Sequence, residues 1–544
     1  MRKVSIRKTT VNLKPLFGGC RFDTNTFSIR SDEAYRLINC HINEVGITYS
    51  RGGSRKVLTS TIDGEVTSQV QYNRKVGSVT VREILVTIGE KWYKVDGTGL
   101  TQIGSLESSN KPSIVTFHDG VGGQIAILAN GVDFKKYDGT SVSDLLPDFA
   151  GTFPTDFKPK YLYVYDGRLW TAGMNDKPTR AHASGLRTPL TWDSSDFFSY
   201  DERSMEPLTG LSSCWSYLVA CKKDKTYINT EGNPQSTTVQ QILVADGEGT
   251  SSHWSIVPHN NMIFFYNEKK VFSGELRAAV EDGLVITEVS HKIKKKLEEV
   301  SEHSEVEGVY DPAKENIYWG LKRTVSIDNW DLVISYNVKL SSYSDPFSGK
   351  REVWNGWWDG EYLNARCLTK MVDDDGDERI YRAGTHGNIY KLEGKNVYKD
   401  EKSDGNKAKF ETLIHLGQIA PGGVARNKTF RQAVILLYQN VDNPVLVNGT
   451  TKFRFNVDNR FQSENIQMTL NGVTPYWNDG DNENKTSTWG GTLWLSNPMM
   501  SYFVDLGVRG KFITFIIENT SDQFADEIAY GGGQVIFQYK SLRR

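Results

Sequence analysis

The sequence predicts an all-β protein in which a β-propeller-like array stands between an N-terminal extended arm and a C-terminal β-sandwich. One observation is composition: 49 Gly and only 16 Pro accompany 13 Trp, 25 Tyr and 24 Phe among 544 residues. This combination favours β-strands joined by tight turns. The other observation is a hairpin pattern that returns about every 40–50 residues, the spacing of four-stranded propeller blades. Because one such unit cannot bury its own faces, the copies are expected to stack into a ring.

The clearest copy of the hairpin pattern spans residues 161–173. Two runs rich in β-forming residues flank the turn dipeptide Asp166-Gly167, which is a strong local signal for a hairpin. Comparable pairs of runs lie at residues 84–95, 125–137, 215–229, 262–274, 316–336 and 379–392. We therefore expect about five to seven blades within residues 59–394.

Residues 1–58 precede the array and are predicted to form an extended arm that contains one short helix. Ser31 is placed to cap this helix, two acidic residues follow in its first turn, and Ala34, Leu37 and Ile38 share one face. These features predict a helix that begins after Ser31 and ends near Asn39.

A second helix is predicted inside the array, at residues 289–300. Val289, Ile293, Leu297 and Val300 recur at helical spacing and form an apolar stripe. Lysines at positions 292 and 294–296 are expected to face outward. They could be read as a DNA-binding patch, but a charged face opposite an apolar stripe is ordinarily a solvated face, and we adopt that interpretation.

The polar residues 395–409 are interpreted as a linker, and residues 410–544 as a C-terminal β-sandwich. Within the sandwich, strand-like runs occur at residues 430–438, 451–457, 512–517 and 534–539. Long strands separated by Gly- and Asn-rich connections are typical of antiparallel sandwiches.

Charge and cysteine content restrict the function classes. The sum of 64 Lys and Arg against 66 Asp and Glu gives a net charge of −2, so free nucleic acid is not the obvious ligand, although DNA passing through a pore is compatible with it. Five cysteines without CxxC spacing argue against a disulfide framework or a zinc site and suggest free thiols made in a reducing cytoplasm. No apolar run approaches the roughly 18 residues of a membrane helix, and the basic N-terminus lacks the apolar core of a signal peptide.

The search for catalytic chemistry gives no predicted catalytic, cofactor-binding or metal-binding residue, and we expect the protein not to be an enzyme. The histidines form no HxH or HExxH pattern and lie at His41, His118, His182, His253, His259, His291, His303, His386 and His415. The acidic stretches 373–378 and 478–483 resemble calcium loops in their alternating carboxylates, but they lack a suitably placed downstream Glu and are interpreted as solvated loops. Thr191-Trp192 occurs without the rest of a sialidase repeat, and no GxSxG, P-loop or GxGxxG context is present.

A tryptophan cluster, Trp354, Trp357 and Trp358, permits two interpretations. Exposed on the surface, these rings could line a saccharide-binding cleft of a host-receptor module. Buried, they would form a blade edge packed on its neighbour, and this is the interpretation that we favour.

Three segments resemble the tail nozzle, or packaged-DNA-stabilising, proteins of short-tailed bacteriophages. The first contains Phe17-Gly18-Gly19, Asn25, Ile29, Asp32-Glu33-Ala34, Leu37-Ile38-Asn39, Gly46 and Arg51-Gly52-Gly53. The second contains Tyr165 to Trp170, Pro189 to Trp192, Leu218 to Lys222 and Thr226-Tyr227. The third contains Gly417-Gln418, Lys428 to Arg431 and Leu506 to Ile513. Together these loose motifs span nearly the whole chain.

The resemblance implies a structural virion protein, made in the bacterial host cytoplasm, that forms a ring, commonly sixfold, around the tail axis. Such a homohexamer would extend the tube, retain packaged DNA and form the channel for its ejection without sequence-specific binding. Implied partners are tail adaptor or portal-vertex proteins, tail fibres or spikes and the host cell surface, and the N-terminal arm would bind a neighbouring subunit or the adjoining tail ring. Alternatives are a glycan- or receptor-binding propeller, a carbohydrate-active propeller enzyme, which would need clustered carboxylates on one face, and a neck or tail-hub protein of another phage type.

Overall fold

The computed structural model describes residues 8–59, 62–118, 123–150, 157–276, 284–324, 329–343, 351–359, 363, 365–392, 399–402, 406–421, 423, 426–438, 449–458, 460–470, 488–489, 492–493, 499–519 and 529–539. Within these residues no helix is both long and apolar enough to cross a membrane. The short helical segments are η1 (His253–Ser255), η2 (His291–Ile293), α1 (Lys294–Leu297), α2 (Val338–Ser342) and η3 (Thr385–Gly387).

Seven β-sheets succeed one another along residues 66–392, and the first five are formed by consecutive strands. Blade 1 comprises β7 (Val66–Val76), β8 (Val79–Ile88), β9 (Lys91–Asp96) and β10 (Gly99–Ser105). Blade 2 comprises β11 (Ser113–His118), β12 (Gln124–Ala129), β13 (Phe134–Tyr137) and β14 (Val142–Asp144). Blade 3 comprises β16 (Tyr161–Tyr165), β17 (Arg168–Ala172), β18 (Arg180–Gly185) and β19 (Thr188–Ser199), and the short strand β15 (Asp148–Ala150) pairs in parallel with β19 at its outer edge. Blade 4 comprises β20 (Gly210–Cys214), β21 (Tyr217–Cys221), β22 (Lys225–Asn229) and β23 (Gln241–Asp246). Blade 5 comprises β24 (Val257–His259), β25 (Met262–Asn267), β26 (Lys270–Leu276) and β27 (Leu284–Glu288).

The last two blades join the ring to the rest of the chain. Blade 6 comprises β28 (Glu302–Asp311), β29 (Asn316–Lys322), β30 (Leu332–Asn337) and β31 (Trp354–Trp358). Blade 7 comprises β32 (Ala365–Val372), β33 (Glu378–Gly384), β34 (Ile389–Leu392) and, from before blade 1, β6 (Ser54–Lys56). The ring is thus closed by a strand that precedes it in sequence.

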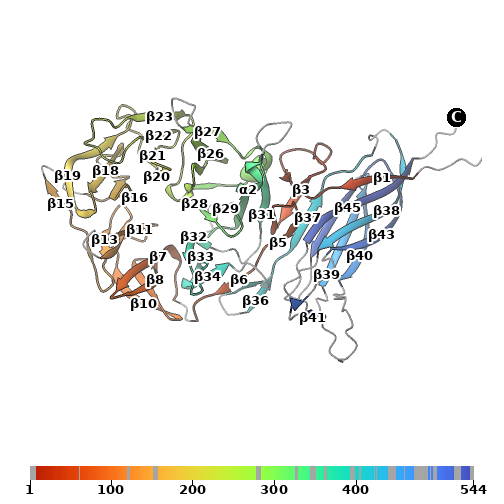
Figure 1. Ribbon diagram of the computed structural model, residues 1–544, viewed down its shortest axis with the longest axis horizontal. Coiled ribbons are helices and arrows are strands. Elements are labelled where there is room, and N and C mark those ends of the chain that lie inside the picture. Colours follow the sequence, from red (N-terminus) through yellow and green to blue (C-terminus); the bar gives the residue numbers. More distant parts are fainter. Residues whose placement is uncertain are drawn as a thin grey trace, which may run out of the picture.

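The seven blades form a closed β-propeller (Figure 1). The first strand of each blade contacts the first strand of the next, from β7 through β11, β16, β20, β24 and β28 to β32, and β32 contacts β7. This arrangement confirms the predicted all-β propeller and falls within the predicted range of blades. All seven hairpins predicted from the sequence are present, six of them as the middle strands of a blade and the hairpin at 161–173 as β16 and β17.

The hydrophobic core lies between adjacent blades, which explains why the strands have nearly continuous apolar runs. In β25, Ile263 and Phe265 pack against blade 4, whereas Phe264 and Tyr266 pack against blade 6. Successive side chains of a strand point to opposite faces, and both faces of each blade are covered. The runs therefore lack the polar alternation of a half-exposed sheet.

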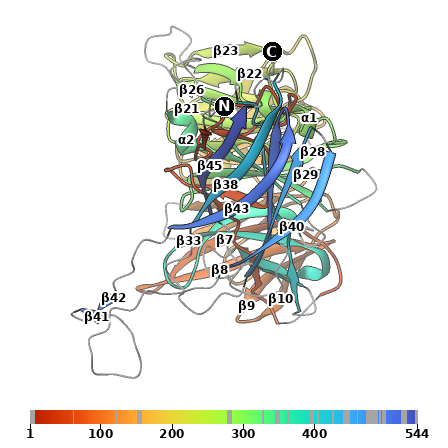
Figure 2. The same cartoon turned by 90° about the vertical axis from the view of Figure 1, so that its right-hand side faces the viewer.

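The C-terminal β-sandwich incorporates the N-terminal segment. One of its sheets contains β4 (Cys40–Ile42), β5 (Thr48–Ser50), β45 (Ala529–Tyr539), β38 (Lys428–Tyr438) and β43 (Met499–Gly510), with β1 (Lys8–Leu13) on β45. The other contains β3 (Glu33–Ile38), β37 (Thr412–Leu416), β44 (Ile513–Asn519), β39 (Gly449–Val457) and β40 (Arg460–Leu470), with β2 (Gly19–Cys20) on β3. A separate ladder pairs β41 (Thr488–Trp489) with β42 (Thr492–Leu493). Figure 2 shows β45, β38, β43 and β40 running obliquely across the side of the molecule that faces the viewer.

Blade 6 and the sandwich share one sheet. Strand β31 pairs in parallel with β3, at Ile38 and Trp357, and β3 pairs antiparallel with β37. The resulting sheet has ten strands and runs from β28 at the propeller axis to β40 at the edge of the sandwich. The two parts are therefore connected by backbone pairing within one sheet.

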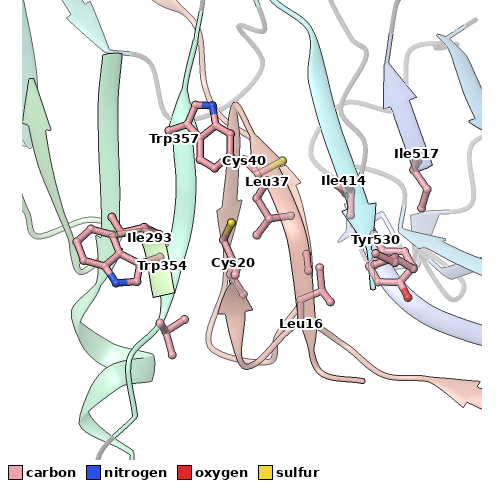
Figure 3. Close-up of a cluster of buried hydrophobic side chains, with 14 of the residues drawn as sticks. Leu16, Cys20, Leu37, Cys40, Ile293, Trp354, Trp357, Ile414, Ile517 and Tyr530 are labelled. Atoms are coloured by element: carbon pink, nitrogen blue, oxygen red, sulfur yellow. The ribbon is translucent and has the colours of Figure 1, made fainter. Parts of the chain in front are cut away.

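The N-terminal segment also supplies the middle of the core between these two parts. Figure 3 shows Leu16, Cys20, Leu37 and Cys40 between the tryptophans of β31 and the sandwich residues Ile414, Ile517 and Tyr530. The residues in this list are at most 3 % exposed. The extended arm predicted for residues 1–58 is therefore, in its described part, built into the fold of its own chain.

The predicted helix after Ser31 is wrong, because these residues form strand β3. Both faces of β3 are covered: Ala34 and Leu37 are fully buried, and the backbone pairs with β31 on one side and β37 on the other. The apolar spacing fits a helix equally well, but backbone pairing with two strands far away in sequence overrides local propensity.

Part of the predicted linker, residues 395–409, forms β-strands. Residues 399–401 and 407–409 form β35 (Lys399–Glu401) and β36 (Lys407–Lys409), which extend blade 7 beyond β6. Asp400 is 2 % exposed and pairs with Arg51. Strands this short and polar have no recognisable pattern, and the buried ion pair connects β35 to the segment that precedes β6.

The helix predicted at 289–300 is shorter, spanning only η2 and α1, although its apolar stripe is buried as expected. Two of the lysines predicted to be solvated are not. Lys292 Nζ lies 2.8 Å from Glu33 Oε1 and donates to the Gly18 carbonyl, and Lys296 is 5 % exposed beside Trp357. Long aliphatic stems let these cations reach partners from positions on the apolar side.

Candidate ligand-binding cavity on the propeller axis

Each histidine belongs to a different helix or strand. Within the described residues no group of three or more His, Cys, Asp and Glu side chains is placed to hold a metal ion. Burial lowers the pKa of His182, His253 and His415 to about 4 in each case, with nearby cations adding to the effect. These three side chains are therefore neutral at pH 7; His182 is buried, and His253 and His415 are half-buried.

The acidic loop 373–378 uses its first carboxylate within the turn itself. Asp373 Oδ1 accepts hydrogen bonds from the backbone N–H groups of Asp375 and Asp377, and Oδ2 lies 2.8 Å from Lys391 Nζ. Burial would raise the pKa of the Asp373 carboxyl, but these interactions lower it. The loop is a hairpin connection between β33 and its partner β32, and the stretch 478–483 lies outside the described residues.

The tryptophan cluster is buried. Trp354, Trp357 and Trp358 are 0 %, 3 % and 3 % exposed, and the Trp354 indole N–H donates to the Val289 carbonyl. The blade-edge interpretation is thus confirmed, and the proposed surface saccharide cleft at these residues is excluded.

A cavity of about 1020 Å³ opens on the propeller axis, at the end where the first strand of each blade begins. Its lining comes from blades 1, 2, 3, 6 and 7 and from the connection between blades 4 and 5. Small-molecule sites typically occupy roughly 300–1000 Å³. The cavity is therefore at the upper end of the size range of a ligand site.

Lys111 forms the floor of the cavity and spans the axis. It precedes β11 of blade 2, is 4 % exposed, and places Nζ 2.6 Å from Glu307 Oε2 in blade 6. The same ammonium donates to the Arg366 carbonyl in blade 7 and lies over the rings of Trp254 and Trp330. Burial raises the pKa of the Glu307 carboxyl, although Lys111 opposes this. One side chain thus connects blades on different sides of the ring.

A second ion-pair network lines the wall. Arg366 contacts Glu305 at 3.1 Å and Glu65 at 3.4 Å, and Lys322 contacts Glu305 at 3.2 Å. Burial alone would raise the pKa of the Glu305 carboxyl, but the adjacent guanidinium and ammonium groups lower it to about 2. Glu305 is therefore ionised at neutral pH and its charge is compensated.

The lining as a whole has no excess charge. Its carboxylates are Asp63, Glu65, Glu90 and Glu305, and its cations are Lys91, Lys111, Lys160 and Arg366. Four negative and four positive groups give a formal sum of zero. The rest of the polar lining consists mainly of amides and hydroxyls, among them Ser109, Asn110, Asn175, Ser251 and Ser304.

Sequence reasoning predicted no site residue and missed this cavity. Its lining residues are contributed one or a few at a time by connections and strand starts spread over residues 62–366, so no local motif marks them. The lining residues share a position within the blades. They lie before or at the start of a blade's first strand, or at the turn between its second and third strands. That position becomes informative only when the ring closure is known.

Comparisons with known proteins identify no family for this chain. No protein-family profile and no curated protein matches the sequence. Among solved structures, crystals of BBS1N in complex with ARL6DN match with TM-scores of 0.37 and 0.41, at 9 % identity, over 63 % of this chain and 97 % and 98 % of theirs. The Kluyveromyces lactis Hsv2 structure matches with a TM-score of 0.29, at 12 % identity, over 50 % of this chain and 70 % of its own. These similarities carry no inference about what this chain binds.

Proposed function

We propose that this chain is a structural protein of a bacteriophage tail, a nozzle-like subunit that assembles into a ring, extends the tail tube and contributes to the channel through which DNA leaves. The observation that carries the proposal is the ten-stranded sheet shared by blade 6 and the sandwich. A subunit that transmits force along a tail needs parts that keep their relative orientation. The resemblance of the three sequence segments to nozzle proteins supports the same function.

The channel in this proposal lies between subunits, not inside the propeller. Lys111 reaches from blade 2 to Glu307 in blade 6 and to blade 7, and this contact closes the propeller's own axis to a duplex. A ring of copies would instead enclose DNA along its central symmetry axis. The near-zero net charge suits passage without tight binding, because strong phosphate contacts would hold the DNA.

Ring formation requires a head-to-tail interface between copies, commonly repeated six times in this kind of assembly. The described part of the N-terminal arm is paired within its own chain, so we place the interface elsewhere on the subunit. Tail adaptor or portal-vertex proteins on one side and fibres, spikes or the cell surface on the other are the expected neighbours. The proposed role is structural and includes no catalytic step, and it places the protein in the virion tail.

The test is mass photometry of the purified chain, alone and mixed with the tail-adaptor ring of its virion. A hexamer or dodecamer, or a monomer that becomes one on the adaptor, is the expected result. A monomer that ignores the adaptor and cleaves or binds surface glycan in its place would overturn the proposed ring. A hexamer that binds at the neck and not at the tail tip, located by electron microscopy of virions, would favour a neck or hub position.

A further inference from the structure

Four polar side chains in the lining of the axial cavity have no hydrogen-bond partner among the described residues. The side-chain amides of Asn110 and Asn175 make no hydrogen bond in the described part of the chain, and both residues are exposed at the cavity rim. Deeper in the wall, Tyr161 and Tyr93 are 8 % and 6 % exposed. Their hydroxyls also make no hydrogen bond to the described residues, and they do not belong to the fully enclosed polar atoms that lack a partner.

These four residues offer a particular combination of groups. An amide donates and accepts hydrogen bonds, and a phenol hydroxyl does both as well. They stand beside aromatic surface, because the half-buried Trp254 lines the cavity and packs edge-on against Tyr161 at 5.9 Å. The Tyr161 ring itself is covered by His253, whose ring lies 5.0 Å away. Alternating donors and acceptors next to an aromatic wall match a ligand that has hydroxyl groups on its edge and C–H groups on its face.

The electrostatics of the cavity do not favour a strongly charged ligand. The formal charges of its lining sum to zero, and its two most enclosed cations are engaged: Lys111 by Glu307, and Arg366 by Glu305 and Glu65. A phosphate or a polyanion would have to compete with these carboxylates. The described residues also lack a set of ligands for a metal ion.

We propose that the axial cavity is a binding site for a neutral oligosaccharide, held by hydrogen bonds to Asn110, Asn175 and Tyr161 and by ring packing against Trp254. The volume of about 1020 Å³ leaves room for more than one sugar ring. The cavity lies within a single subunit, so the proposal holds whether or not the chain forms a ring. In a tail protein, such a site would give each subunit a weak contact with cell-surface glycan, and a ring would multiply it.

The experiment uses the full chain on a glycan array that presents neutral hexose and N-acetylhexosamine oligosaccharides beside sialylated ones. The best neutral hit is then titrated by calorimetry against the wild type and three variants. Tyr161→Phe keeps the ring and removes one hydroxyl, so we expect about a 3–10-fold weaker Kd. The double change Asn110→Ala with Asn175→Ala is expected to weaken binding further. Tyr343→Phe, an exposed tyrosine that does not line the cavity, should leave the Kd unchanged.

Three results would overturn the proposal. They are no binding to any neutral glycan on the array, preferential binding of sialylated glycans, and binding that both Tyr161→Phe and the Asn110→Ala/Asn175→Ala double variant retain at full strength. The variants alter exposed amides and one hydroxyl, and circular dichroism before titration shows whether each is folded. Mass photometry of the same samples separates loss of sugar binding from loss of ring assembly.

Discussion

The guanidinium of Arg51 and the carboxylate of Asp400 form a buried ion pair between segments 349 residues apart, with Nη1 at 3.1 Å from Oδ1. Ser54 donates to the same carboxylate at 2.8 Å, and Phe410 covers the guanidinium at 3.8 Å. Arg51 precedes the first blade, and Asp400 follows the last. The pair therefore connects the segments before the first blade and after the last blade, at the point where the ring closes.

Replacement of Asp400 by Asn is expected to lower the free energy of unfolding by about 3–5 kcal/mol, because it leaves the Arg51 charge buried without its counter-ion. Urea unfolding at pH 7 measures the change. The exposed pair Lys370–Glu378, in blade 7, is the control: Glu378→Gln should cost less than about 1 kcal/mol. A double variant, Arg51→Met with Asp400→Leu, should recover much of the loss. Equal effects of Asp400→Asn and Glu378→Gln would show that the buried pair is not what holds the closure.

This closure shows where sequence reasoning was sufficient and where it was not. Hairpins such as the one at Asp166-Gly167 are recognisable because their signal is local: a turn dipeptide between two apolar runs. Strand β3 was predicted as a helix because Ser31 resembles a cap and its apolar spacing suits both structures. Only its pairing with β31 and β37, more than 300 residues away, selects the strand. The short strand around Asp400 likewise contacts Arg51, which is 349 residues away in the sequence.

The cavity is lined by residues that are far apart in the sequence. Lys111, Arg366 and Glu305 meet because seven blades close into a ring, and no spacing along the chain relates them. The propeller itself was predictable from repetition, and its cavity follows from the ring geometry. The chemistry that lines the cavity depends on single residues, which repetition does not predict.

Gly356 is expected to be essential to the joint between blade 6 and the sandwich. Its φ is +84°, and a Cβ at this position would lie 2.0 Å from the Leu37 carbonyl oxygen of β3. Gly356→Ala should therefore lower the free energy of unfolding by more than about 3 kcal/mol. Gly376, with φ +89° and open space around it, is the matched control, because alanine there meets only left-handed backbone strain of about 1–2 kcal/mol.

Differential scanning calorimetry tests this prediction through the number of transitions as well as their position. With the contact to β3 disturbed, we expect Gly356→Ala to separate the unfolding of the sandwich from that of the propeller, and Gly376→Ala to leave the profile as in the wild type. Similar profiles and similar costs for the two variants would contradict the rigid joint on which the proposed function rests.

The stability of the protein is expected to fall as the pH drops below about 6.5, because several buried or half-buried histidines resist protonation. His253 accepts a hydrogen bond from the Leu211 N–H at Nδ1, and burial lowers its pKa from 6.5 to about 4. Between these pH values the unfolded chain binds a proton that the folded chain does not, so the free energy of unfolding rises with pH. One such group changes it by up to about 1.4 kcal/mol per pH unit.

Urea unfolding of the wild type and of His253→Gln at pH 7.5 and pH 5 checks the sign. Loss of the imidazole packing destabilises the variant at both pH values. At pH 5 the wild type is destabilised as well, because its unfolded state binds a proton at His253, and the variant lacks this contribution. We expect its cost to be smaller at pH 5 than at pH 7.5, by about 1–2 kcal/mol. A cost that is equal at the two pH values, or larger in acid, would exclude His253 as a source of the acid sensitivity.

The backbone of Trp215 is strained, and its side chain is mostly exposed, so burial adds little to its stability. It occupies the first position of the two-residue turn between β20 and β21, with φ +52°, and is 70 % exposed. Glycine and asparagine suit this left-handed position, whereas a tryptophan there is an outlier. Trp215→Gly should therefore raise the free energy of unfolding by about 0.5–1 kcal/mol, as thermal or urea unfolding can measure. Leu146 is 79 % exposed without a positive φ, so Leu146→Gly should instead lower stability, because glycine adds freedom to the unfolded chain. If both glycine variants lose stability, the Trp215 ring contributes packing that outweighs its backbone strain.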